Sequence, residues 1–178
     1  MNHPRRSTQV KLASLEAIAR ALNAADVPWL IGDGLAVNAH GYGRLTQDLD
    51  ILIELEPDSI RSAFAALAGL GYRPRVPVTA ESFADPEQRR RWRTEKGMVV
   101  LPFDSGTHPE TPIDLFVEVP FDFSEEHRLA LVEQVAPGIP VRILRLASLL
   151  RMKESAGRPQ DLADIAELRR LHGDAPHE

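Results

Sequence analysis

Periodic and alternating apolar positions predict both helices and strands along the first half of the chain. Apolar residues at roughly helical spacing predict a helix that Ser7 caps and that runs to about Ala25. The apolar stretch VPWLIG, residues 27–32, predicts a short buried strand, and the alternation in DLDILIE, residues 48–54, predicts a second strand. A further helix is expected to begin at Pro57.

The second half repeats this mixture and ends in helices. Residues 73–97 have the least regular pattern. Within them the stretch DPEQRRRWRTEKG, residues 85–97, predicts either a highly charged helix or an exposed loop. Strands are expected at MVVLPF (98–103), TPIDLFVEV (111–119) and IPVRIL (139–144), the first two as a hairpin. Helices are expected from about Glu125 to Val135, in residues 146–157 and in residues 160–173. We therefore expect an α+β fold in a single domain, residues 1–178, with a helical C-terminal part at about 145–172.

Composition is that of an ordinary globular protein and excludes several kinds of binding and catalytic site. The formal net charge is −5, which argues against a protein that coats duplex nucleic acid, because such binding depends on Lys and Arg at the phosphates. The chain has no cysteine, which excludes disulfides, thiolate catalysis and zinc–sulfur sites. It also has no apolar run of about 18 residues and no signal-peptide core, so we expect a cytoplasmic protein with no membrane partner.

Two aspartates lie two residues apart at the start of the second predicted strand. Because side chains alternate along a strand, Asp48 and Asp50 share one face, roughly 6.5–7 Å apart. Carboxylates so placed repel each other, whereas a divalent cation such as Mg²⁺ takes carboxylate and phosphate oxygens as ligands. The alternative is a half-exposed strand with an acidic outer face. A third acid, Asp114, lies between two apolar residues of a later strand, and its alternative is a lone acid at a strand edge.

Glycines precede this acidic pair and favour a phosphate site. Gly32 and Gly34 bracket a turn that begins a helix, and backbone amides at such a turn can hold a phosphate. Arg44 and Thr46 add a cation and a hydroxyl just before the aspartates. Three carboxylates on neighbouring strands that face a glycine turn are typical of metal-assisted transfer from a nucleoside triphosphate.

Two segments of the chain resemble one known family. IGDGLAVNAHGYGRLTQDLDILIE, residues 31–54, resembles the signature of the nucleotidyltransferase superfamily that includes DNA polymerase β. The likeness is greatest to small prokaryotic members in the AbiEii toxin-like group. LLRMKESAGRPQDLADIAEL, residues 149–168, resembles that group as well. The resemblance implies a nucleotidyltransferase-like mixed β-sheet flanked by helices, with further helices at the C-terminus.

The resemblance also implies roles for the matching residues. Asp48 and Asp50 correspond to ligands of Mg²⁺ or Mn²⁺, and Asp114 to a third acid that binds a second ion or accepts a proton from the attacking hydroxyl. With the residues singled out above, the expected nucleotide-binding set is Gly32, Gly34, Arg44, Thr46, Lys153 and Arg158. The alternative for the last two is to cap or pair at the helix break, where Asp161 also matches the family.

The implied reaction moves a nucleoside monophosphate from a nucleoside triphosphate to an acceptor hydroxyl and releases pyrophosphate. The basic segment RRRWR, residues 89–93, indicates first a solvated helix face. The alternative is that it binds a nucleic-acid strand that stacks on Trp92, which would indicate an RNA or tRNA acceptor. The resemblance adds the hypothesis of a toxin that pairs with an antitoxin protein. An antibiotic-type transferase with a small-molecule acceptor is one alternative.

One departure from the family pattern favours another alternative, an inactive binding module. The family turn has two adjacent small residues, whereas this chain has Gly32-Asp33-Gly34. If the carboxylate of Asp33 points inward, it repels a triphosphate.

Overall fold

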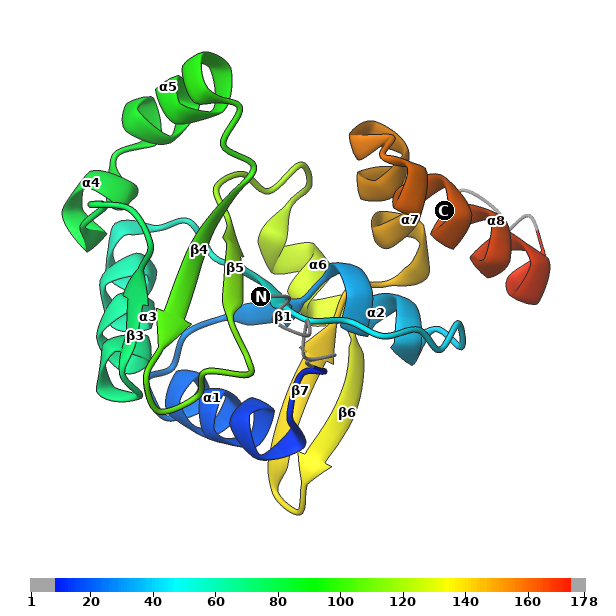
Figure 1. The fold of residues 1–178 in the computed structure, drawn as a ribbon, viewed down its shortest axis with the longest axis horizontal. Coiled ribbons are helices and arrows are strands. Elements are labelled where there is room, and N and C mark those ends of the chain that lie inside the picture. The colour runs from blue at the N-terminus through cyan, green and yellow to red at the C-terminus, as the bar shows by residue number, and fades with distance from the viewer. Residues whose placement is uncertain (1–8, 174–178) are drawn as a thin grey trace, which may run out of the picture.

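The computed structural model describes residues 9–173, so Ser7, the expected cap of the first helix, lies outside the described residues. Within them, one mixed sheet has the strand order β3-β4-β5-β2-β1-β7-β6 (Figure 1). The strands are β1 (Trp29–Ile31), β2 (Leu49–Ile53), β3 (Tyr72–Pro74), β4 (Val100–Ser105), β5 (Ile113–Phe116), β6 (Leu131–Ala136) and β7 (Ile139–Ile143). The helices are α1 (Leu12–Ala24), α2 (Asp33–Ala39), α3 (Pro57–Gly69), α4 (Ala80–Ala84), α5 (Pro86–Lys96), α6 (Phe123–Leu129), α7 (Leu146–Ala156) and α8 (Pro159–His172). The predicted α+β fold is confirmed.

The charged segment within residues 73–97 is a helix, α5, with a defined start and end. The Asp85 carboxylate accepts a hydrogen bond from the backbone N–H of Glu87, and Pro86 occupies the first turn. Gly97, in the left-handed conformation at φ 62°, ends the helix. Of the two alternatives for this segment, the helix is therefore the right one here.

The helix expected from Glu125 to Val135 is wrong in its second half. Helix α6 ends at Leu129, and the following residues form β6, which pairs antiparallel with β7 across a tight turn. Gly138 provides the positive φ of 76° in that turn. Cross-strand pairing with β7 therefore overrides the local helical signal of residues 131–135, as tertiary contacts often do.

The aspartate-bearing strand, β2, lies in the middle of the sheet. It runs antiparallel to β1 and parallel to β5, and β4 and β5 form the predicted hairpin. Leu49, Ile51 and Ile53 are fully buried, as expected for the apolar face. Leu52, on the face of the aspartates, is fully buried as well. The strand is therefore open to solvent only towards its start, where Asp48 and Asp50 lie.

The C-terminal helices bring a distant part of the chain beside the glycine turn. Helix α7 ends at Gly157, at φ 61°, and α8 begins at Pro159. Helix α7 packs against both α2 and α8, so these three helices gather on one side of the molecule (Figure 1). None of the described helices is both long and apolar enough to cross a bilayer.

Candidate active site

Two adjacent cavities meet at the open end of β2. The larger, of about 440 Å³, lies between the β4–β5 hairpin and α7, and the smaller, of about 350 Å³, lies against the segment that leads into β2. Five residues line both cavities: Asp33, Asp50, Asp114, Arg158 and Asp161. Four of the acids singled out from the sequence therefore form part of the boundary between the two cavities.

Two of the three predicted catalytic acids lie at this boundary, and the third lies beside it in the smaller cavity. Asp50 and Asp114 are register partners on the parallel strands β2 and β5, and Asp48 immediately precedes β2 and lines the smaller cavity. Among the described residues, no Lys, Arg or His nitrogen lies within 4.0 Å of any of these three carboxylates. The structure thus brings the three acids into one site and leaves them without direct counter-charges in the described part of the chain.

Burial, together with the charges of neighbouring acids, raises the pKa of all three acids. Burial, followed by the charges of Asp33, Asp114 and Asp48, raises the pKa of Asp50 well above its usual range. Burial and the charge of Asp48 raise the pKa of Asp114 to about 6, against an opposing effect of Arg75. The pKa of Asp48 is raised by burial too. A cation placed among these groups would reverse all three shifts.

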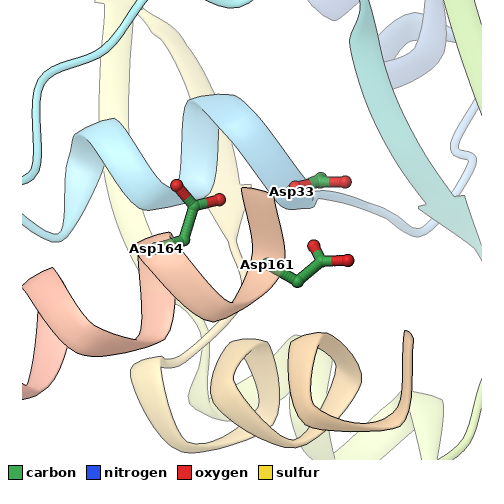
Figure 2. Close-up of side chains that lie close together, drawn as sticks. All are labelled: Asp33, Asp161 and Asp164. Carbon is green, nitrogen blue, oxygen red and sulfur yellow. The ribbon is translucent and has the colours of Figure 1, made fainter. Parts of the chain in front are cut away.

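A second set of acids is closer together but differs in kind. Asp33, Asp161 and Asp164 offer carboxylate oxygens that all lie within 4.8 Å of one another (Figure 2). Such proximity suits a metal, but the Lys153 ammonium already lies among them, at 2.6 Å from Asp33, 3.1 Å from Asp161 and 2.8 Å from Asp164. We call Asp33, Asp161, Asp164, Lys153, Arg44 and Arg158 the ion-pair cluster.

The arginines complete this cluster. Arg44 donates two hydrogen bonds of 2.8 Å to Asp164, one to each carboxylate oxygen. Arg158 donates to Asp161 at 2.7 Å and to Asp33 at 3.1 Å. Burial opposes ionisation of Asp161 and Asp164, but these hydrogen bonds and those of Lys153 outweigh it and lower the pKa of both acids. Three cations and three acids neutralise one another, so this cluster is not a metal site.

Asp33 points inward, which decides the orientation that its sequence position left open. It is the first residue of α2 and has a φ of 37°, a backbone conformation that is uncommon for a residue other than glycine. Its two carboxylate oxygens contact Lys153 and Arg158 separately, and Arg44 lies 3.7 Å away. Asp33 therefore contributes negative charge to both cavities.

The glycines of the turn are explained by packing. A Cβ atom on Gly34 would lie 2.4 Å from the Thr46 hydroxyl oxygen, and one on Gly32 would lie 2.8 Å from the Leu52 side chain. Thr46 is buried and donates a hydrogen bond to the backbone carbonyl of Asp48, at 3.2 Å. The close approach of α2 to the segment that leads into β2 fixes the position of that segment, and with it the position of Asp48 and Asp50. A contact of these glycines with a nucleotide stays a prediction.

Sequence reasoning missed two residues that shape the site. Asp164 is fully buried and anchors both Arg44 and Lys153. Its signal was the three-residue spacing from Asp161, which places both carboxylates on one face of a helix. Arg75 is the other, because its charge opposes the raised pKa of both Asp48 and Asp114.

Solved structures share the fold of this chain. The chain has the nucleotidyltransferase fold, which it shares with solved structures at TM-scores above 0.5. The solution structure of the antibiotic-resistance factor ANT(2'')-Ia matches with a TM-score of 0.55 and 17% identity, over 90% of this chain and 80% of that one. The crystal structure of ANT(2'')-Ia in complex with adenylyl-2''-tobramycin matches with a TM-score of 0.57 and 14% identity, over 91% and 89%.

A third solved structure has the same fold. An antigenic nucleotidyltransferase-like protein from Paracoccidioides brasiliensis matches with a TM-score of 0.53 and 15% identity, over 90% of this chain and 75% of that one. No protein-family model matches the sequence, and no curated protein matches it either. At these identities the likeness establishes the fold, and membership of the AbiEii toxin-like group stays a prediction.

Proposed function

We propose that this protein is a nucleotidyltransferase that moves a nucleoside monophosphate from a nucleoside triphosphate to an acceptor hydroxyl. The main support is a contrast within the site. Asp48, Asp50 and Asp114 have no cation within 4.0 Å among the described residues, whereas each acid of the neighbouring ion-pair cluster has one. Carboxylates that repel one another and have no cation of their own suit a divalent ion and the phosphates that it carries.

The donor set fits Mg²⁺ or Mn²⁺. Hard oxygen ligands on adjacent strands are what these ions take. The raised pKa of Asp50 and Asp114 reflects their burial and, after it, the repulsion of neighbouring acids, which a cation would relieve. Asp48 and Asp50 would hold the ion, with Asp114 as the third acid. When bound, such an ion stabilises negative charge on the attacking and leaving oxygens of the phosphoryl group.

The remaining chemistry falls to side chains of this chain. The acceptor oxygen bonds to the α-phosphorus while the bond from that phosphorus to the bridging oxygen of pyrophosphate breaks. The hydroxyl proton passes to a carboxylate oxygen of Asp114, which lines both cavities and can therefore reach an acceptor held there. Arg44, Lys153 and Arg158 lie where they can neutralise the leaving pyrophosphate.

A small-molecule acceptor fits the larger cavity. Its volume of about 440 Å³ is in the range of small-ligand pockets. Apolar side chains form much of its wall: Val99, Val100, Phe116, Pro120, Leu149 and Met152. Glu118 and Arg93, also in the wall, supply polar groups. One of the fold's structural neighbours is solved with an adenylylated aminoglycoside, which supports the antibiotic-type alternative.

An RNA acceptor finds less support. The ring of Trp92 packs on Phe83, with centroids 6.5 Å apart, so at least one of its faces is not free for a base. Arg90, Arg91 and Arg93 are each paired with a glutamate. Action on tRNA, a toxin role and an antitoxin partner therefore stay predictions.

Labelling tests the proposal directly. Purified protein with Mg²⁺ and an α-labelled nucleoside triphosphate is incubated with a panel of aminoglycosides and, separately, with total RNA. We expect label in a small molecule. Replacing Asp48 with Asn keeps the shape of the side chain but removes its charge, and should lower the rate by about 100-fold or more. Asp58→Asn, a change at a side chain that is 99% exposed, is the control and should leave the rate unchanged. Labelled RNA would instead support the RNA acceptor, and absence of binding to every triphosphate would support the inactive module.

A further inference from the structure

Asp33 occupies the position in the ion-pair cluster that a ligand can reach. Asp161 and Asp164 are 1% and 0% exposed, and both belong to α8, so they are permanent partners of the cations. Asp33 is 20% exposed, lines both cavities and belongs to α2. Among the three acids of the cluster, Asp33 is therefore the one that an incoming anion can displace without entering the core.

The contacts of Asp33 are those that a phosphate group would make. One of its oxygens accepts a hydrogen bond from Lys153 at 2.6 Å, and the other accepts one from Arg158 at 3.1 Å. Two oxygens held by an ammonium and a guanidinium reproduce the way in which cationic side chains bind phosphate. An anion that reaches Lys153 and Arg158 therefore meets a carboxylate already in place.

The backbone supports a specific role for this side chain. With a φ of 37°, residue 33 has a conformation that glycine or asparagine adopts more readily than aspartate. Residues held in such conformations are compensated by their surroundings, and here the compensation is the pair of contacts with Lys153 and Arg158. The charge of Asp33 also raises the pKa of Asp50 and Asp114, so it acts on the proposed metal site too.

We propose that Lys153 and Arg158 form a phosphate-binding site whose resident anion is Asp33, and that Asp33 determines how strongly the site binds a phosphate chain. A ligand with a single phosphate group gains little binding free energy by displacing the carboxylate. A chain of two or three phosphates reaches Arg44 as well and replaces both contacts of Asp33. Asp33 thus makes the site selective for polyphosphates. That this ligand is a nucleotide rests on the proposed function, whereas the displacement itself does not.

Inorganic pyrophosphate and inorganic phosphate, without metal and in EDTA, are the probes. Their dissociation constants are measured by calorimetry for the unmodified protein, Asp33→Asn and Asp33→Gly. Both replacements suit the positive φ, and Lys153 keeps Asp161 and Asp164, so the variants are expected to fold. Glu118→Gln is the matched control, because Glu118 lines the same larger cavity but pairs with Arg93.

We expect Asp33→Asn and Asp33→Gly to bind pyrophosphate about tenfold more tightly than the unmodified protein, since one like charge leaves the site. The preference for pyrophosphate over phosphate should shrink, and Glu118→Gln should stay within about twofold of the unmodified protein. Unchanged or weaker binding in both Asp33 variants, or an equal effect of Glu118→Gln, would overturn the proposal.

A crystal of the unmodified protein with pyrophosphate gives a second, independent measurement. Phosphate oxygens should contact the Lys153 ammonium and the Arg158 guanidinium, with the Asp33 carboxylate turned away. Pyrophosphate bound elsewhere, with Asp33 still on Lys153, would contradict the displacement. Tighter pyrophosphate binding in the Asp33 variants, without any nucleotidyl transfer by the protein, would support the role of Asp33 as the resident anion. It would reject only the proposed function.

Discussion

At the scale of single residues, aspartates of the proposed metal site and of the ion-pair cluster have opposite effects on stability. The pKa of Asp114 is raised to about 6 from an ordinary value of 3.8, so the folded protein holds this proton more tightly than the unfolded chain. Stability from this group is fully present below about pH 4 and is lost as the pH rises through 6. Asp164, whose pKa is lowered by Arg44 and Lys153 despite its burial, instead adds stability above its unfolded pKa.

Asparagine substitutions test this difference. In EDTA at pH 8, Asp114→Asn should raise the free energy of unfolding by about 1–3 kcal/mol, because it removes a repelled charge, and the gain should fade towards pH 5. Asp164→Asn, the control at a fully buried acid, should lower it by about 3–5 kcal/mol, because Arg44 and Lys153 lose a buried partner. Urea unfolding at both pH values measures the two effects. A loss of stability in Asp114→Asn at pH 8 would show that the charge of Asp114 does not destabilise the folded protein.

At the scale of elements, the ion-pair cluster fastens the C-terminal helices to α2. Lys153 from α7 contacts Asp33 from α2 and two acids from α8, and it is only 3% exposed. Arg158, which joins the same helices, is 64% exposed. Solvent screens an exposed ion pair much more than a buried one. The ion pairs of Lys153 should therefore contribute more to the free energy of unfolding than those of Arg158, although both cations contact Asp33 and Asp161.

Charge removal at each cation measures that difference. Lys153→Met should lower the free energy of unfolding by about 3–5 kcal/mol, because it leaves Asp161 and Asp164 buried with fewer counter-charges. Arg158→Gln should cost under about 1 kcal/mol, because Lys153 still neutralises Asp161. Urea unfolding at neutral pH compares the two variants. Equal losses would mean that burial of Lys153 does not govern the docking of α7 and α8.

Sequence patterns within a few residues predicted the helices and strands better than they predicted which side chains pair with one another in the site. The β4–β5 hairpin and the break at Gly157 were found because turn residues and alternation lie within a few positions of each other. Residues 131–135 were assigned to a helix because pairing with β7 was invisible in that window. Likewise, Asp48, Asp50 and Asp114 were found individually, but Arg44 and Asp164 are 120 residues apart, and no spacing rule links them. The side-chain direction of Asp33 depends on such distant cations too.

At the scale of the whole molecule, the sheet order concentrates unbalanced charge in one place. The chain carries a net charge of −5, yet the ion-pair cluster is neutral within itself. Parallel pairing of β2 with β5 places Asp50 level with Asp114, at the boundary of two cavities. The fold therefore keeps mutually repelling carboxylates together at the boundary of the two cavities, where an ion can relieve the repulsion when it binds.

Thermal unfolding with added metal tests this arrangement without any assumption about the acceptor. A ligand that binds only the folded state at 100 times its dissociation constant adds about 2.7 kcal/mol, or roughly 5–10 °C in melting temperature for a chain of this size. We expect Mg²⁺ or Mn²⁺ to raise the melting temperature of the unmodified protein, and EDTA to reverse the rise. Asp48→Asn should abolish it, whereas Asp58→Asn, at an exposed position on α3, should retain it. An equal rise in both variants would place the bound ion away from Asp48, because removal of one of three ligand charges from a true site weakens binding strongly.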